Sequence, residues 1–221
     1  MTNEPVRVIT IDGPAASGKG TVAERMAAAL GFHYLDSGAL YRLATYRAIR
    51  QGVALDDAAG LEAVARSMAP VFTEGRIEMD GEDVTLAIRT EEVSRATSRV
   101  AAVPGVRKAL FDLQRSAAKA PGLVADGRDM GTVVFPHADL KIFLTASARV
   151  RAERRAKQLE ARGETADLEA LTRDLEERDR RDRERAEAPL KAAPDAHTLD
   201  TSDIGIEEVV KKLLEWWRDA Q

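Results

Sequence analysis

The chain has 221 residues, a formal net charge of -4 and no cysteine. This length suits one sizeable domain, and the lack of cysteine excludes disulfides, thiolate zinc sites and cysteine nucleophiles. The negative net charge excludes a general polyanion binder, so a nucleic-acid role would need a local basic patch. The apolar runs are too short to span a membrane, and residues 1–5 lack the features of an export signal. We therefore expect a cytoplasmic protein with no membrane partner.

A strand, a glycine-rich loop and a helix are predicted in succession at the start of the chain. Residues 6–11 form a β-branched run that ends at a turn, as a buried strand does. Residues 19–30 are rich in helix formers and are followed by Gly31, a residue that commonly ends a helix. The loop between them matches G-x-x-x-x-G-K and consists of Gly13, Pro14, Ala15, Ala16, Ser17, Gly18, Lys19, Gly20 and Thr21.

This loop predicts a site for the phosphates of ATP. Its glycines let backbone N–H groups turn toward phosphate oxygens, and Lys19 can reach the β- and γ-phosphates. The general motif has a Mg²⁺-binding Ser or Thr directly after the lysine, whereas here Gly20 stands there and the hydroxyl belongs to Thr21. We therefore expect Mg²⁺ to keep mostly water ligands. A GTPase switch is excluded because its guanine-reading N-K-x-D motif needs an asparagine, and the only one is Asn3.

The next segment predicts a short strand, two helices and an antiparallel patch. The strand is expected at residues 33–35 and is followed by a helix that ends near residue 51. A second helix is expected at 57–69, and hairpin patterns occupy 71–86. A helix that starts near Ser37 would aim Ser37, Tyr41 and Arg42 toward one phosphate. The alternative is an N-cap serine followed by ordinary surface residues.

Strands alternate with helices through the second half of the chain. The expected elements are a helix after Pro104, strands at 123–125 and 140–144, a helical stretch at 148–185, a strand at 197–200 and a helix at 206–217. This alternation predicts an α/β fold with a parallel central sheet.

Charged residues directly follow the strand expected at 123–125. Asp126, Arg128 and Asp129 stand at the end of a parallel strand, where open α/β sheets bind ligands. The alternative is a loop held by salt bridges. Farther along, Arg149 to Arg185 contain eleven arginines and eleven acidic residues. Most of these should form solvated i,i+4 pairs, each worth about 0.2–0.5 kcal/mol, and their balance argues against a nucleic-acid patch.

Three segments give the chain a specific resemblance. They are D-S-G-A-L-Y-R at 36–42, D-G-R-D-M-G-T-V-V-F-P at 126–136 and R-D-R-R-D-R-E-R-A at 178–186. Together they resemble the bacterial cytidylate kinase family, and the resemblance extends over essentially the whole chain. It implies a monomeric, three-layer P-loop kinase fold over residues 1–221. An antiparallel β insert in the monophosphate-binding region is implied at about 66–100, and a helical lid at about 150–170.

The resemblance also implies a role for particular residues. Phosphate binding falls to Ser37, Tyr41, Arg42, Arg128 and Arg185, cytosine recognition to Ser98, Arg107 and Asp129, and sugar binding to Arg178 and Asp182. The lid arginines are Arg151, Arg154 and Arg155, with Arg151 near the adenine, and Asp126 orients Mg²⁺-bound water. Lys19, Arg128, Arg155 and Arg185 are the implied catalytic residues. A carboxylate can accept from the cytosine amino group, and a guanidinium fork suits phosphate.

The implied reaction transfers the γ-phosphoryl group of ATP to CMP, with dCMP as a second acceptor, within pyrimidine nucleotide metabolism. A phosphate monoester with a second pKa of about 6 is mostly dianionic at neutral pH, so no general base is required. Water must be excluded, and we expect the insert and lid to close over the substrates. Two alternatives remain: another small-acceptor kinase acting on UMP, AMP or shikimate, and a non-catalytic module in which ATP gates a partner contact.

Overall fold

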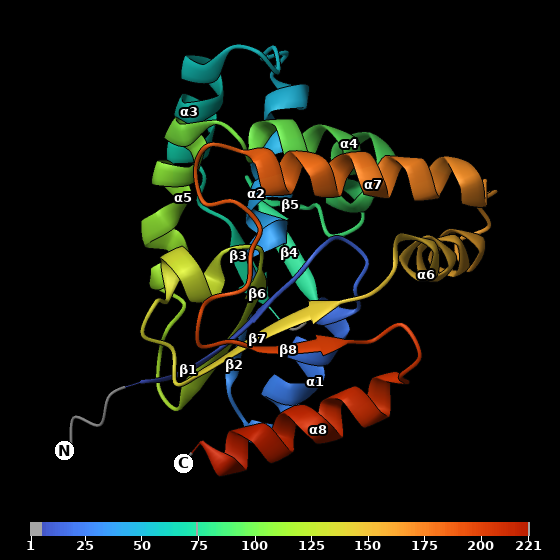
Figure 1. The fold of residues 1–221 in the computed structure, drawn as a ribbon. Coiled ribbons are helices and arrows are strands. Elements are labelled where there is room, and N and C mark those ends of the chain that lie inside the picture. Colours follow the sequence, from blue (N-terminus) through green and yellow to red (C-terminus); the bar gives the residue numbers. More distant parts are fainter. Residues whose placement is uncertain (1–5, 74, 221) are drawn as a thin grey trace. The chain divides into compact units, whose positions relative to one another are not determined.

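The computed structural model describes residues 6–73 and 75–220 (Figure 1). Its contacts divide the chain into two compact units, which we call the sheet unit (residues 1–36 and 115–221) and the inserted unit (residues 37–114). Residues 1–5, on which the expectation of no export signal rests, lie outside the described residues. Within the described ranges, no helix has both the length and the apolar character that a membrane crossing requires.

The sheet unit is built on five parallel strands in the order β2-β6-β1-β7-β8. Their bounds are Arg7–Asp12 (β1), His33–Asp36 (β2), Gly122–Gly127 (β6), Leu140–Thr145 (β7) and His197–Asp200 (β8). In the register of these strands Asp36 is paired with Asp126, and Asp12 is paired with Gly127. Asp12 and Asp36 therefore end β1 and β2, and Asp126 is the next-to-last residue of β6. All three lie at the same edge of the sheet, which is the edge where such sheets bind ligands.

Two helices share the apolar core with this sheet. They are α1 (Lys19–Leu30) and α8 (Ile206–Asp219), which contribute Met26 and Leu213 to a cluster with Ile9 of β1. The helix α1 ends where expected, because Gly31 adopts a left-handed φ of 66°. Of the two tryptophans in α8, Trp217 is buried in the core, with its ring 5.7 Å from that of Phe32.

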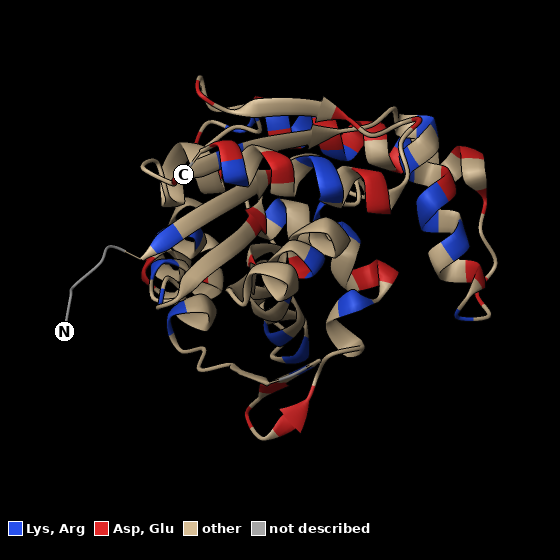
Figure 2. Ribbon diagram, turned by 90° about the horizontal axis from the view of Figure 1, so that it is seen from below, with Lys and Arg blue, Asp and Glu red and all other residues tan. Residues whose placement is uncertain are grey.

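The arginine-rich stretch forms two helices, α6 (Ala148–Glu160) and α7 (Leu168–Glu184), so the prediction of one helical stretch over 148–185 is wrong at 161–167. Gly163 has a φ of 77°, which an α-helix cannot continue, and the Asp167 side chain caps α7 by accepting from two backbone N–H groups. The predicted i,i+4 pairs are present, as between Arg149 and Glu153. Basic and acidic segments accordingly alternate along the helices (Figure 2).

The inserted unit combines helices with a small sheet. Its elements are α2 (Ser37–Arg50), α3 (Ala58–Arg66), β3 (Val71–Thr73), β4 (Arg76–Met79), β5 (Glu82–Asp83), the short helical turn η1 (Ala87–Arg89), α4 (Glu91–Val100) and α5 (Pro104–Arg115). The strands pair antiparallel, which confirms the hairpin prediction. The helix α4 was not predicted from the sequence. The apolar residues of its buried face are Val93, Ala96 and Val100, and the rest of the helix is polar. The side chain of Thr90 caps the helix by accepting a hydrogen bond from the Val93 N–H.

The predicted α/β fold, with a parallel central sheet and a separate antiparallel insert, is thus confirmed. The single-domain layout with its insert and lid boundaries stays a prediction.

Candidate active site

The phosphate-binding loop lies where the sequence places it, between β1 and α1. Gly13 is required there because a Cβ atom at this position would lie 2.1 Å from the backbone oxygen of Leu144. At the other end of the loop, Gly18 precedes α1 with a left-handed φ of 89°. The hydroxyl of Ser17 is buried and makes no hydrogen bond to another described residue. The loop therefore offers a buried polar group that a ligand could satisfy.

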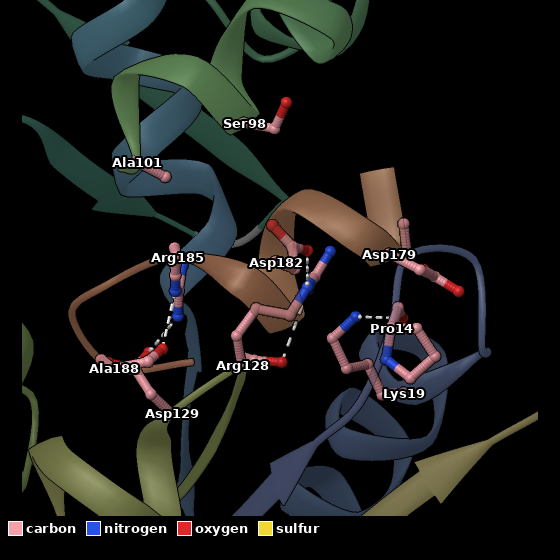
Figure 3. A network of polar contacts seen from close by, with 12 residues as sticks. Pro14, Lys19, Ser98, Ala101, Arg128, Asp129, Asp179, Asp182, Arg185 and Ala188 are labelled. Carbon is pink, nitrogen blue, oxygen red and sulfur yellow. Dashed lines mark hydrogen bonds and ion pairs between the residues drawn. The ribbon is translucent and has the colours of Figure 1, made fainter. Parts of the chain in front are cut away.

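Lys19 lies at the base of this loop and is only 7% exposed. Its Nζ donates to the carbonyl of Pro14 over 3.0 Å (Figure 3). Burial, followed by the positive charge of Arg128, lowers the pKa of Lys19 to about 7. An anion bound in the loop would reverse this effect, because it would favour the charged ammonium.

Two arginines of α6 hold the back of the loop. Arg151 donates to the Ala15 carbonyl over 3.1 Å and forms a two-pronged pair with Asp179 of α7. Arg154 donates to the Ser17 carbonyl over 3.2 Å and also bonds Thr201. Since Arg151 is 3% exposed, its guanidinium braces the loop in this structure, and the role near adenine stays a prediction. Arg155 instead reaches Gln158 on its own helix.

The loop after β6 and the end of α7 form a second polar cluster in the sheet unit. Arg128 donates to Asp182 over 3.0 Å, and Arg185 lies 3.9 Å from Asp129 (Figure 3). Burial alone would raise the pKa of Asp182, but Arg128 and Arg178 hold it below the usual value. The structure therefore brings together Arg128, Asp129, Arg178, Asp182 and Arg185, which the sequence places on two distant segments.

A third feature surrounds Asp126, the residue expected to orient Mg²⁺-bound water. The Tyr34 hydroxyl donates to Asp126 Oδ1 over 2.9 Å. Burial, followed by the charge of Asp126, raises the pKa of Tyr34, so this hydroxyl stays protonated. A Cβ at Gly20 would lie 3.8 Å from Asp126 Oδ2, at van der Waals contact, so the start of α1 lies close to this carboxylate. Within the described ranges, no group of three or more acidic or histidine side chains could hold a metal alone.

The inserted unit positions the remaining predicted residues. The helix α2 starts at Ser37, as expected, and carries Tyr41 and Arg42 in its first two turns. The Arg107 guanidinium of α5 lies 5.6 Å from the centre of the Tyr41 ring and donates to the carbonyl of Ala101. Ser98 is buried on α4. Tyr41 and Arg107, assigned to phosphate and base, are therefore direct neighbours.

Sequence reasoning missed three residues that support the site: Asp12, Tyr34 and Asp179. Each contacts a residue far away in the sequence: the separation is 118 positions for Asp12, 92 for Tyr34 and 28 for Asp179. The position of Asp12, directly before the loop and at the end of a buried strand, was the one available signal.

Chemically, the sheet unit offers an amide cradle with a lysine, and close to it a set of arginines ordered by carboxylates. Such an arrangement can bind phosphate groups and stabilise charge during their transfer.

Comparison with known proteins identifies relatives of this chain. The profile of the cytidylate kinase family matches residues 9–219. A cytidylate kinase from Ralstonia pickettii is 54% identical over 217 residues, which cover 98% of this chain and 94% of that protein. A cytidylate kinase from Chromobacterium violaceum is 53% identical, with 98% and 97% covered, and one from Neisseria gonorrhoeae is 55% identical, with 96% and 97% covered.

Proposed function

The chain belongs to the cytidylate kinase family, and we propose that it transfers the γ-phosphoryl group of ATP to CMP, with dCMP as a second acceptor. The observation that carries the proposal is the closeness of Lys19 to Arg128, whose positive charge adds to burial in lowering the pKa of Lys19 and which is itself held by Asp182. A phosphate-binding lysine and an ordered arginine cluster in one unit suit a donor phosphate and an acceptor phosphate. We further propose a cytoplasmic monomer without nucleic-acid or membrane partners.

On the donor side, residues 13–21 bind the ATP phosphates, with Lys19 on the β- and γ-phosphates and Arg155 available from α6. The unpartnered Ser17 hydroxyl and the left-handed Gly18 support this role. The residues around Asp126 fit Mg²⁺, because its carboxylate is buried, accepts a hydrogen bond from Tyr34 and lies close to Lys19 and to Gly20 at the start of α1. Asp126 would hold the ion through water, and the ion would neutralise charge on the ATP phosphates.

On the acceptor side, the residues proposed to bind the CMP phosphate are Ser37, Tyr41, Arg42, Arg128 and Arg185. Asp129, Ser98 and Arg107 read the cytosine, and Arg178 and Asp182 bind the sugar. The carboxylates of Asp129 and Asp182 already face arginines, so the guanidinium groups are oriented before the ligand arrives.

The chemistry needs no general base from the protein, because the acceptor phosphate is mostly dianionic at neutral pH. Lys19 and the arginines stabilise the charge on the transferred group, and their fixed positions favour in-line attack.

An acceptor panel tests this proposal. With ATP as donor, CMP and dCMP should be phosphorylated efficiently, and UMP, AMP and shikimate much more slowly. Rapid transfer to one of those three acceptors in preference to CMP would favour another small-acceptor kinase. ATP binding without transfer to any acceptor would favour a non-catalytic module.

Binding of ATP should be accompanied by proton uptake at pH 8. The free enzyme holds Lys19 with a pKa of about 7, so the side chain is mostly neutral at pH 8 and becomes charged beside the triphosphate. We expect an uptake of about one proton per ATP at pH 8 and much less at pH 6. Calorimetry in two buffers with different ionisation enthalpies measures this number. Lys19→Arg should abolish the uptake, since arginine stays charged, and equal heats in both buffers for the wild type would contradict the assignment.

A further inference from the structure

We propose that Asp12 is a positioning residue that fixes the loop carrying Arg128 and Asp129, and thereby sets the affinity for CMP. This inference rests on the proposed function of that loop. It adds a residue from the donor side of the sheet to the acceptor site.

The contact joins two segments that are far apart in the chain. Asp12 is the last residue of β1 and is 4% exposed. Its Oδ1 accepts from the backbone N–H of Met130 over 2.8 Å, and its Oδ2 accepts from the backbone N–H of Gly131 over 2.8 Å. Both oxygens of one buried carboxylate are therefore used to hold two consecutive amides.

These two amides begin the short helical turn η2 (Met130–Val134), whose N-cap residue is Asp129. The first N–H groups of a helical turn have no acceptor within it. The Asp129 side chain makes no capping hydrogen bond, so Asp12 supplies the acceptors and a negative charge that favours this helix end. Because Arg128 and Asp129 directly precede these amides, the backbone that carries them is fixed at this point.

The close packing of the same loop on β1 is a second, independent observation. A Cβ at Gly131 would lie 2.8 Å from Thr10 Oγ1 and 3.3 Å from the side chain of Lys141. Glycine is thus needed for the loop to approach β1 closely enough for Asp12 to reach both amides.

Asp12 is also close to charged groups of both substrate sides. The pKa of Asp12 is raised to about 7, mainly by burial and also by the charge of Asp129, against the opposing effects of its two amide hydrogen bonds and of Lys19. Measurements at pH 8 therefore examine the carboxylate form, which can accept from both amides at once.

The test is Asp12→Asn, with CMP and a non-hydrolysable ATP analogue titrated separately by calorimetry at pH 8. Asparagine keeps the size of the side chain but can accept from only one amide and turns its NH₂ group toward the other. We expect the Kd for CMP to rise about tenfold, with the Kd for the ATP analogue changed less than about twofold. Equal weakening of both ligands, or of the ATP analogue alone, would mean that Asp12 supports the phosphate-binding loop instead.

Two further variants make the result specific. Ile9→Val lies on the same strand, three positions before Asp12, and shortens a side chain of the apolar core, so both affinities should stay near the wild-type values. Gly131→Ala leaves Asp12 in place but moves the loop, and should reproduce the selective loss of CMP affinity even if Asp12→Asn fails to fold. Selective CMP loss in Ile9→Val, or normal CMP binding in Gly131→Ala, would overturn the proposal. Failure of the wild type to phosphorylate CMP would instead refute the proposed function.

Discussion

Lys19→Met should lower turnover about a thousandfold or more without loss of the fold. The ammonium group is the one cation inside the phosphate-binding loop, and a buried donor of this kind contributes far more to the transition state than an exposed one. Steady-state kinetics with saturating ATP and CMP measures the effect. Turnover within a few fold of the wild type would remove the loop lysine from the mechanism.

The same variant should change the pH dependence of stability. Lys19 has a pKa of about 7 in the folded chain and about 10.5 when unfolded. The unfolded state therefore binds more protons between pH 7 and 10.5, so this residue makes stability rise with pH in that window. In denaturant titrations, the free energy of unfolding of Lys19→Met should therefore rise less between pH 7 and 10.5 than that of the wild type.

As a matched control, Lys141→Met removes another buried lysine, which pairs with Asp195. It should reduce stability while turnover stays within about threefold.

Asp182→Ala should raise the KM for CMP about a hundredfold and leave the KM for ATP within a few fold. Asp182 is the buried partner of Arg128 and lies close to Arg178 and Arg185. Removal of one partner of a buried, hydrogen-bonded charge pair typically costs about 2–5 kcal/mol, because the other charge is left uncompensated. The variant thus loses both the proposed sugar contact and the orientation of Arg128, the arginine proposed to bind the CMP phosphate.

Glu184→Ala provides the control for this variant. Glu184 lies two positions farther along α7 and forms an exposed pair with Arg180 at 3.7 Å. Such pairs contribute little, so both KM values should remain near those of the wild type. Equal increases in the two KM values of Asp182→Ala would contradict the assignment of Asp182 to CMP.

The parts of the fold that could be predicted from sequence depend on local patterns. The succession β1, phosphate-binding loop and α1 has a β-branched run, a glycine motif and a terminal glycine, so its bounds were predicted closely. The helix α4 lacks a strong apolar pattern and was missed. The break between α6 and α7 was overlooked because the arginine-rich composition concealed two local signals, Gly163 and Asp167.

In the candidate site too, residues within a local motif could be predicted, whereas residues that depend on contacts distant in sequence could not. The loop lysine could be assigned from its motif alone, whereas the roles of Arg128 and Asp182 depended on family resemblance, since 54 residues separate them. The contacts of Asp12 with Met130 and Gly131 could not be predicted, because no periodicity relates a strand end to amides 118 and 119 positions away. Such contacts arise only when the parallel sheet brings β1 beside β6.

The bonds from Arg151 and Arg154 to carbonyls of the phosphate-binding loop limit how α6 can move. Its first two turns are tied to the loop and, through Asp179 and Thr201, to α7 and the segment after β8. A swing of the whole helix would break several buried bonds at once. Leu159 of α6 also packs with Leu171 and Leu175 of α7, so a motion of α6 that kept these contacts would have to carry α7 and the loop with it.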